Sequence, residues 1–95
     1  MVIWTNRRDH LARLGVTVEQ AEESLNDADR VVFNPDPASQ SGKSVRTIGY
    51  SRQARAVLCV VTVTVSGVKY GVTYGATAFK ANPKYQLIYK EAGNG

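Results

Sequence analysis

The run of ten residues from Ala56 to Val65, AVLCVVTVTV, constrains the fold more than any other segment of this sequence. Its first half is apolar on both faces of an extended chain, which is typical of a central strand. Its second half alternates Val with Thr, as a strand does when one face meets water. The run therefore predicts a central β-strand, and the rest of the chain has to supply the strands that pair with it.

Other segments with strand character flank this run. Residues 45–50 place Arg46, Ile48 and Tyr50 on one face of a strand. The remaining strand candidates are Val31–Phe33, which two prolines follow, a return strand from Val68 after the tight turn Ser66-Gly67, and a short edge strand at Val2–Trp4.

Two helices are expected before the sheet. Thr17 and Gln20 have the spacing of a capping box, and apolar residues follow them at helical intervals. A shorter helix precedes this one, with Thr5 or Asn6 as its cap and Gly15 just beyond its end.

A third helix is expected at the C-terminal end. Asn82 is a cap residue, Pro83 takes the first helical position, and Tyr85 and Tyr89 share one helical face. The prediction is an α+β fold with two N-terminal helices, an antiparallel sheet of about four strands and a C-terminal helix, in one domain over residues 1–95.

The charge of the chain is divided unevenly. Residues 1–42 carry four arginines against seven acidic side chains, a net charge of −3. Residues 43–95 carry eight Lys and Arg against Glu91 alone, a net charge of +7. This asymmetry indicates a basic face for a polyanion on the C-terminal half. The alternative is a solvated surface whose two halves attract each other on folding.

Composition excludes several kinds of site. One Cys excludes a disulfide framework and a Cys-based zinc site, and one His excludes a His-based metal cluster. Gly42-Lys43-Ser44 lacks the earlier Gly of a phosphate loop, because Pro37 stands there. We also find no signal peptide and no apolar stretch of about 18 residues. We therefore expect a cytoplasmic protein that uses no metal or cofactor, with Cys59 packed in its core.

The C-terminal half supplies most candidate functional residues. Arg46 is either a half-buried structural arginine or a group aimed into a groove. Metal-independent RNA cleavage needs a base for the 2′-hydroxyl, positive charge at the phosphate and a proton donor for the leaving oxygen. The candidate catalytic residues are Arg46, His10, Lys80 and Tyr85, and the candidate RNA phosphate ligands are Lys43, Arg52, Arg55 and Lys84. For Lys80 and Lys84 the alternative is a solubility role at a helix end, and for His10 it is an ordinary surface position.

Three stretches of the sequence resemble BrnT-type toxins, in order and spacing. The first runs from Trp4 through His10-Leu-Ala-Arg-Leu-Gly-Val-Thr-Val-Glu-Gln-Ala21, which is similar to an opening with an aromatic residue, a short helix, a Gly-Val-Thr step and an acidic helix. The others are Phe33-Asn-Pro-Asp-Pro37 followed by Thr47-Ile48-Gly49, and Asn82-Pro-Lys-Tyr-Gln-Leu-Ile-Tyr89 in the last helix.

The resemblance implies the toxin of a bacterial type II toxin–antitoxin pair. Such a toxin has a fold similar to RelE-type ribonucleases, cleaves RNA without metal and is neutralised by a small DNA-binding antitoxin. Two positions depart from the family pattern. An acidic–basic pair usually precedes the Thr-Ile-Gly strand, where this chain has Lys43 and Ser44. An arginine usually stands between the last strand and helix, where this chain has Phe79 and Lys80.

Three functional hypotheses follow. The first is a ribonuclease toxin that inhibits translation, with RNA and an antitoxin as its partners. The second is a non-catalytic RNA- or protein-binding module on the same fold, as in a degenerate toxin or a phage-borne protein. The third is a protein that binds a partner at its sheet edge and has no role with nucleic acid.

Overall fold

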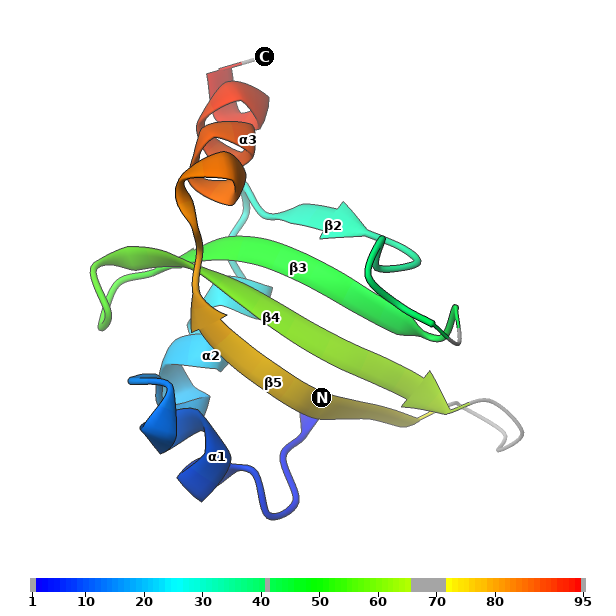
Figure 1. Cartoon of the computed structure of the whole chain (residues 1–95). Coiled ribbons are helices and arrows are strands. Elements are labelled where there is room, and N and C mark those ends of the chain that lie inside the picture. Colours follow the sequence, from blue (N-terminus) through cyan, green and yellow to red (C-terminus); the bar gives the residue numbers. More distant parts are fainter. Residues whose placement is uncertain (1, 41, 66–71, 95) are drawn as a thin grey trace.

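The strand β4 (Ala56–Val65) lies at the centre of a five-stranded sheet, with the bounds that its sequence predicts. The computed structural model describes residues 2–40, 42–65 and 72–94, and the strand order is β1-β5-β4-β3-β2 (Figure 1). The other elements are β1 (Val2–Ile3), α1 (Arg8–Arg13), α2 (Val18–Leu25), β2 (Val31–Phe33), β3 (Ser44–Ser51), β5 (Val72–Lys80) and α3 (Pro83–Asn94).

The fold is α+β, but two parts of the predicted layout are wrong. Within the described residues the sheet has five strands rather than about four, and β1 pairs with β5 in parallel, with Val2 opposite Thr73 and Ile3 opposite Tyr74. The two N-terminal helices therefore follow a strand that belongs to the sheet. The edge strand expected at Val2–Trp4 is confirmed as β1, but its parallel pairing was not predictable, because its partner lies about 70 positions further along the chain.

Helices α1 and α2 cover one face of the sheet. The main core cluster joins them to the central strands through side chains that are almost fully buried: Leu11, Val16, Val18, Ala21, Leu58, Val60 and Ala78. The half-buried Trp4 packs against this cluster, as a core anchor should. In Figure 1, α2 passes behind the strands and α1 lies below them.

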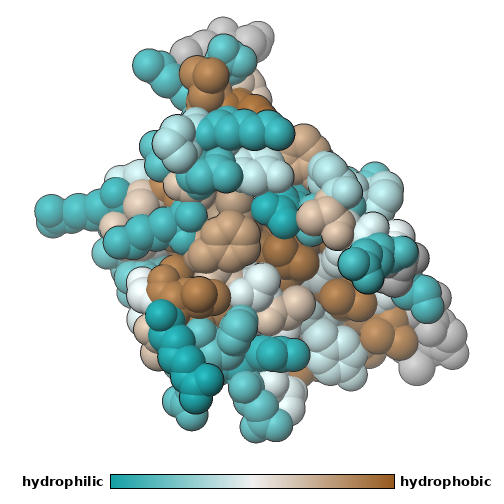
Figure 2. Space-filling view, viewed as in Figure 1, coloured by the Kyte–Doolittle hydropathy of each residue, from teal (hydrophilic) through white to brown (hydrophobic). Residues whose placement is uncertain are grey.

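The opposite face, which we call the open face, is covered only in part by α3. Ile48, Cys59 and Phe79 lie in one row across β3, β4 and β5, and Tyr85 and Tyr89 of α3 pack against this row. Cys59 is fully buried, so its predicted core position is confirmed. Figure 2 shows apolar side chains along the middle of the open face, with hydrophilic side chains around them.

Local signals set the ends of two helices as predicted. The capping box of α2 is present, since Gln20 N donates to Thr17 Oγ1 at 3.1 Å and Thr17 N donates to Gln20 Oε1 at 3.0 Å. Asn82 caps α3 by accepting from Tyr85 N at 3.0 Å.

The start of α1 differs from the prediction. The helix begins at Arg8, and its N-cap residue, Arg7, makes no side-chain cap bond, so neither Thr5 nor Asn6 caps it. Gly15 follows the helix with a φ of 78°, in the left-handed region expected beyond a helix end. The predicted turn at Ser66-Gly67 and the start of the return strand at Val68 lie outside the described residues.

Helix α2 lies against β3 at a glycine. A Cβ built on Gly49 would overlap the carbonyl oxygen of Ser24, so no larger residue fits unless the helix backbone moves. Ser24 itself is fully buried. The close approach fixes the end of α2, and with it the segment that leads from α2 to β2.

Gly49→Ala should therefore destabilise the protein by about 1–3 kcal/mol, because the backbone of α2 has to give way. Urea denaturation measures this change. Gly93→Ala is the matched control: no atom lies within 4 Å of its Cβ position in α3. It should leave stability unchanged or raise it by up to about 1 kcal/mol. Equal midpoints for Gly49→Ala and wild type would contradict the close contact.

Candidate nucleic-acid interface

Arg46 is buried under α3 and bound to a carboxylate. Its Nε donates to Asp36 Oδ1 at 3.0 Å and its Nη2 donates to Asp36 Oδ2 at 3.3 Å. The two side chains are only 12% and 4% exposed. The Arg46 Cζ lies 5.7 Å from the centre of the Phe79 ring and 5.2 Å from that of Tyr85. These contacts correspond to the first of the two alternatives for Arg46, the half-buried structural arginine.

The pair keeps Arg46 charged inside the protein. Burial alone would lower the pKa of the guanidinium, but the hydrogen bonds and the charge of Asp36 raise it above its usual value. Burial likewise raises the pKa of the neighbouring Cys59 thiol, so Cys59 has little thiolate character.

Asp36 is the partner that the sequence did not reveal. Its N–H donates to Ser44 O at 2.8 Å, and its Oδ1 accepts from Ala38 N at 3.0 Å, which ties the loop after β2 to the start of β3. A signal was nevertheless present. The antiparallel pairing of β2 and β3 sets Phe33 opposite Arg46, so an acid three residues beyond Phe33 lies near that arginine.

His10 reaches the sheet from the side opposite Arg46. Its Nε2 lies 2.9 Å from Thr77 Oγ1. Thr77 is opposite Val61 in the ladder, and Val61 is opposite Arg46. Neighbouring strands are about 5 Å apart, so Thr77 and Arg46 are separated by roughly 10 Å along one row of the sheet. Two of the candidate catalytic residues thus lie at the two ends of this row.

Three candidate cations lie at one end of the sheet and a fourth lies at the start of the helix that follows β5, and we call these four together the basic end. Arg52 and Arg55 are in the turn between β3 and β4, Lys80 ends β5 opposite Leu58, and Lys84 is in the first turn of α3. All four are exposed. Within the described residues the ion pairs are Arg8–Glu19 and Arg46–Asp36, and none involves these four side chains. In Figure 1 the β3–β4 turn and the arrowhead of β5 lie at the same end of the sheet.

Lys43 lies apart from the other phosphate candidates. Lys43 directly precedes β3 and Arg52 directly follows this strand. A strand of eight residues is roughly 25 Å long, so the two side chains start from opposite ends of β3. The cluster that the sequence suggested along this strand is therefore divided between its two ends.

Tyr85 connects the basic end to the buried arginine. Its ring makes an edge contact with Phe33, with 6.2 Å between the ring centres, and Lys84 Nζ lies 5.9 Å from the centre of the Tyr85 ring. Among the candidate residues, Arg46, Lys84 and Tyr85 are therefore in direct contact, whereas His10 is not part of this group.

A second carboxylate holds α3 beside β3. Asp27 Oδ2 accepts from Tyr50 N at 2.7 Å and from the Tyr89 hydroxyl at 2.5 Å, and its Oδ1 accepts from Asp29 N at 3.0 Å. Burial alone would raise the pKa of Asp27, but these hydrogen bonds hold it below its usual value. Burial and the nearby carboxylate raise the pKa of the Tyr89 hydroxyl.

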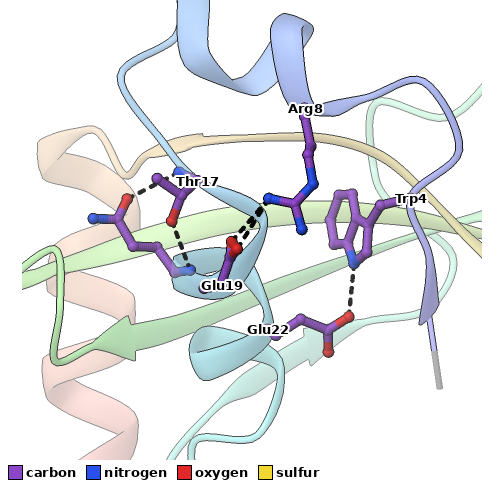
Figure 3. Close-up of polar contacts among 6 residues, drawn as sticks. Trp4, Arg8, Thr17, Glu19 and Glu22 are labelled. Carbon is purple, nitrogen blue, oxygen red and sulfur yellow. Dashed lines mark hydrogen bonds and ion pairs between the residues drawn. The ribbon is translucent and has the colours of Figure 1, made fainter.

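Other acids of the N-terminal half bind groups within the protein as well. Glu22 accepts from Trp4 Nε1 at 2.7 Å and Glu19 pairs with Arg8 at 2.9 Å, as Figure 3 shows. Glu23 Oε1 accepts from Ser51 Oγ and Gln53 N, which holds the β3–β4 turn and keeps the pKa of Glu23 low.

No protein-family model and no curated protein sequence matches this chain. Within the described residues there is no group of three His, Cys, Asp or Glu that could hold a metal ion. In the same part of the chain, no helix is long and apolar enough to cross a membrane.

The bonds to Asp27 predict a specific dependence of stability on pH. Because the pKa of Asp27 is lowered by folding, its ionised form stabilises the fold above about pH 4, and this contribution is lost as the pH falls through the folded pKa. Tyr89→Phe removes one donor to the carboxylate. It should lower the thermal midpoint at neutral pH, and the difference from wild type should shrink as the pH falls below about 4.

Tyr74→Phe is the control for this experiment, since the structure shows no hydrogen bond from Tyr74 to a carboxylate among the described residues. Its difference from wild type should not change with pH. A Tyr89→Phe difference that is constant from neutral to acid pH would contradict the stabilisation of α3 by an ionised Asp27.

Proposed function

We propose that this protein binds RNA through its basic end. The observation that carries the proposal is that three exposed cations, Arg52, Arg55 and Lys80, lie at one end of the sheet, with the exposed Lys84 at the start of the helix that follows. Phosphate groups bind to such cations, and RNA affinity depends largely on them.

Two tyrosines next to the basic end support an RNA ligand over a simple anion. Tyr50, at the end of β3, is 41% exposed, and Tyr85 touches Lys84. Unpaired bases stack on aromatic rings beside a charged backbone track. We therefore propose single-stranded RNA as the ligand.

The finer form of this proposal is a RelE-like toxin of a type II toxin–antitoxin pair, acting in the cytoplasm and neutralised by a small DNA-binding antitoxin. Its support is the resemblance of three stretches of the sequence to BrnT-type toxins. The fold agrees with it as an α+β fold, whereas the number of strands and the placement of the helices after β1 differ from the expected RelE-like layout. The buried pair of Arg46 with Asp36 favours the non-catalytic form of such a protein, since the guanidinium is already bound to a carboxylate.

Metal-independent RNA cleavage is the second candidate function. The row from Arg46 through Val61 to Thr77 favours it, because Arg46 stands at one end of this row and His10 binds Thr77 at the other end. In this form His10 acts on the proton of the 2′-hydroxyl and Tyr85 donates to the leaving oxygen. Arg46 and Lys80 then stabilise the charge on the phosphate.

RNA binding is tested with a fluorescent single-stranded RNA of about ten nucleotides, titrated at several salt concentrations. The double variant Arg55→Asn/Lys80→Gln should weaken binding to every sequence. It should also lower the slope of log affinity against log salt by about 0.7 for each phosphate that the variant no longer neutralises. Asn suits position 55, whose φ is 52°. Arg13→Ala, in α1, is the matched control and should bind as wild type does. Equal affinity of the double variant and the control would overturn the proposed interface.

Cleavage is tested by expressing the chain in bacteria without an antitoxin and by incubating the purified protein with RNA in a chelator. A catalytic protein should arrest growth and cut RNA. Arg46→Ala should relieve the arrest, but it also leaves Asp36 buried without its partner, which destabilises the fold. Arg46→Gln/Asp36→Asn removes both charges together and separates these effects. Normal growth and intact RNA with the wild-type chain would exclude cleavage and leave the binding proposal in place.

A further inference from the structure

A hollow of about 490 Å³ adjoins the basic end. This volume lies within the range of about 300–1,000 Å³ that is usual for small-molecule sites. The hollow is formed where the end of α2, the segment before β2 and the end of β3 meet. Its lining residues are Glu23, Asn26, Asp27, Ala28, Asp29, Tyr50 and Arg52. Arg52 belongs to both the hollow and the basic end, so a nucleotide bound in the hollow would have its backbone beside the other cations.

Tyr50 forms an aromatic wall of this hollow. Its side chain is 41% exposed, yet its backbone N–H is bound to Asp27 at 2.7 Å. The ring is therefore presented to solvent from a fixed strand end. A base that stacks on Tyr50 would not require the strand to become ordered first, which favours binding.

The acids of the hollow are not equivalent. Asp27 already accepts three hydrogen bonds, and Glu23 Oε1 accepts two. The carboxylate of Asp29 is exposed and accepts no hydrogen bond from the described residues. Arg52 is also exposed and makes no ion pair with the described residues, and its charge helps to keep the pKa of the nearby Glu23 low. The hollow thus offers a carboxylate and a guanidinium that are both available to a ligand.

We propose that this hollow binds a guanine base of the RNA, an inference that rests on the proposed RNA-binding function. Guanine has two adjacent donors, N1–H and the N2 amino group, which together match the two oxygens of a carboxylate such as Asp29. Its O6 and N7 acceptors match an arginine such as Arg52. Adenine has no such pair of adjacent donors and lacks O6, and uracil has one N–H donor. Tyr50 supplies the stacking surface, and Asp29 is the residue that sets the base preference.

The test compares single-stranded RNAs of eight nucleotides by fluorescence anisotropy, at one salt concentration. Each is a run of uridines with guanosine, inosine, adenosine or uridine at one central position. The guanosine RNA should bind about tenfold more tightly than the adenosine and uridine RNAs. Inosine lacks the N2 amino group, so the affinity of the inosine RNA should lie between that of the guanosine RNA and those of the adenosine and uridine RNAs.

Variants locate the preference in the hollow. Asp29→Asn should remove the preference for guanosine while the all-uridine RNA keeps its wild-type affinity. Tyr50→Ala should weaken the binding of the guanosine RNA more than the binding of the other three RNAs. Asp9→Asn is the matched control, because Asp9 is an exposed acid of α1 outside this hollow, and it should retain the full preference.

The outcomes separate this inference from the function on which it rests. Equal binding of all four RNAs, still weakened by Arg55→Asn/Lys80→Gln, would overturn the guanine site and leave RNA binding intact. A guanosine preference that survives Asp29→Asn would also overturn it. Absence of binding to every RNA would overturn the proposed function. A further outcome would also overturn the guanine site. If the four RNAs bind equally, and an arginine-containing peptide binds tightly to wild type but not to Asp29→Asn, the hollow binds a protein partner instead.

Discussion

The buried pair of Arg46 and Asp36 connects parts of the structure that are far apart in the sequence. Arg46 comes from the third strand of the sheet, Asp36 from the loop before it, and the rings that enclose the guanidinium come from β5 and α3. A guanidinium can be buried only with a carboxylate and further contacts beside it, because an unpaired charge in the interior costs several kcal/mol. The position of α3 on the open face and the path of the loop after β2 are therefore linked through one ion pair.

The distribution of charge has a related origin. The acidic half of the chain folds behind and beside the sheet, and its carboxylates bind an indole N–H, a hydroxyl, backbone N–H groups or arginines. Asp36, Asp27 and Glu23 bind groups of the basic half, but within the described residues only Asp36 makes an ion pair with one of its cations. The cations of the turn, of the β5 end and of the α3 start consequently remain exposed, so the asymmetry of the sequence becomes an asymmetry of the surface. Attraction between the two halves explains the ion pair of Arg46 with Asp36, but it does not explain why the cations of the basic end are exposed.

Much of the candidate site was predictable residue by residue, but its grouping was not. The four cations of the basic end were all candidates from the sequence, three as phosphate ligands and Lys80 as a catalytic residue, and three of them lie at one end of the sheet. Lys43 was expected with them and lies at the far end of β3, because consecutive residues of a strand are spread over its length. Asp36 and Asp27 were not singled out, since an acid in a polar loop gives no sign of what will be packed on it. The hollow beside Tyr50 is likewise made by three segments that have no common motif.

The sequence by itself determined the elements whose signals are local. The apolar run of β4, the capping box of α2 and the Asn-Pro start of α3 depend on neighbouring residues, and the structure has each of them where the sequence predicts it. Only the tertiary structure decided the parallel pairing of β1, the ion pair under α3 and the gathering of cations at one end of the sheet. These depend on contacts between residues that are many positions apart, and the free energy of such contacts is defined only once the chain has packed.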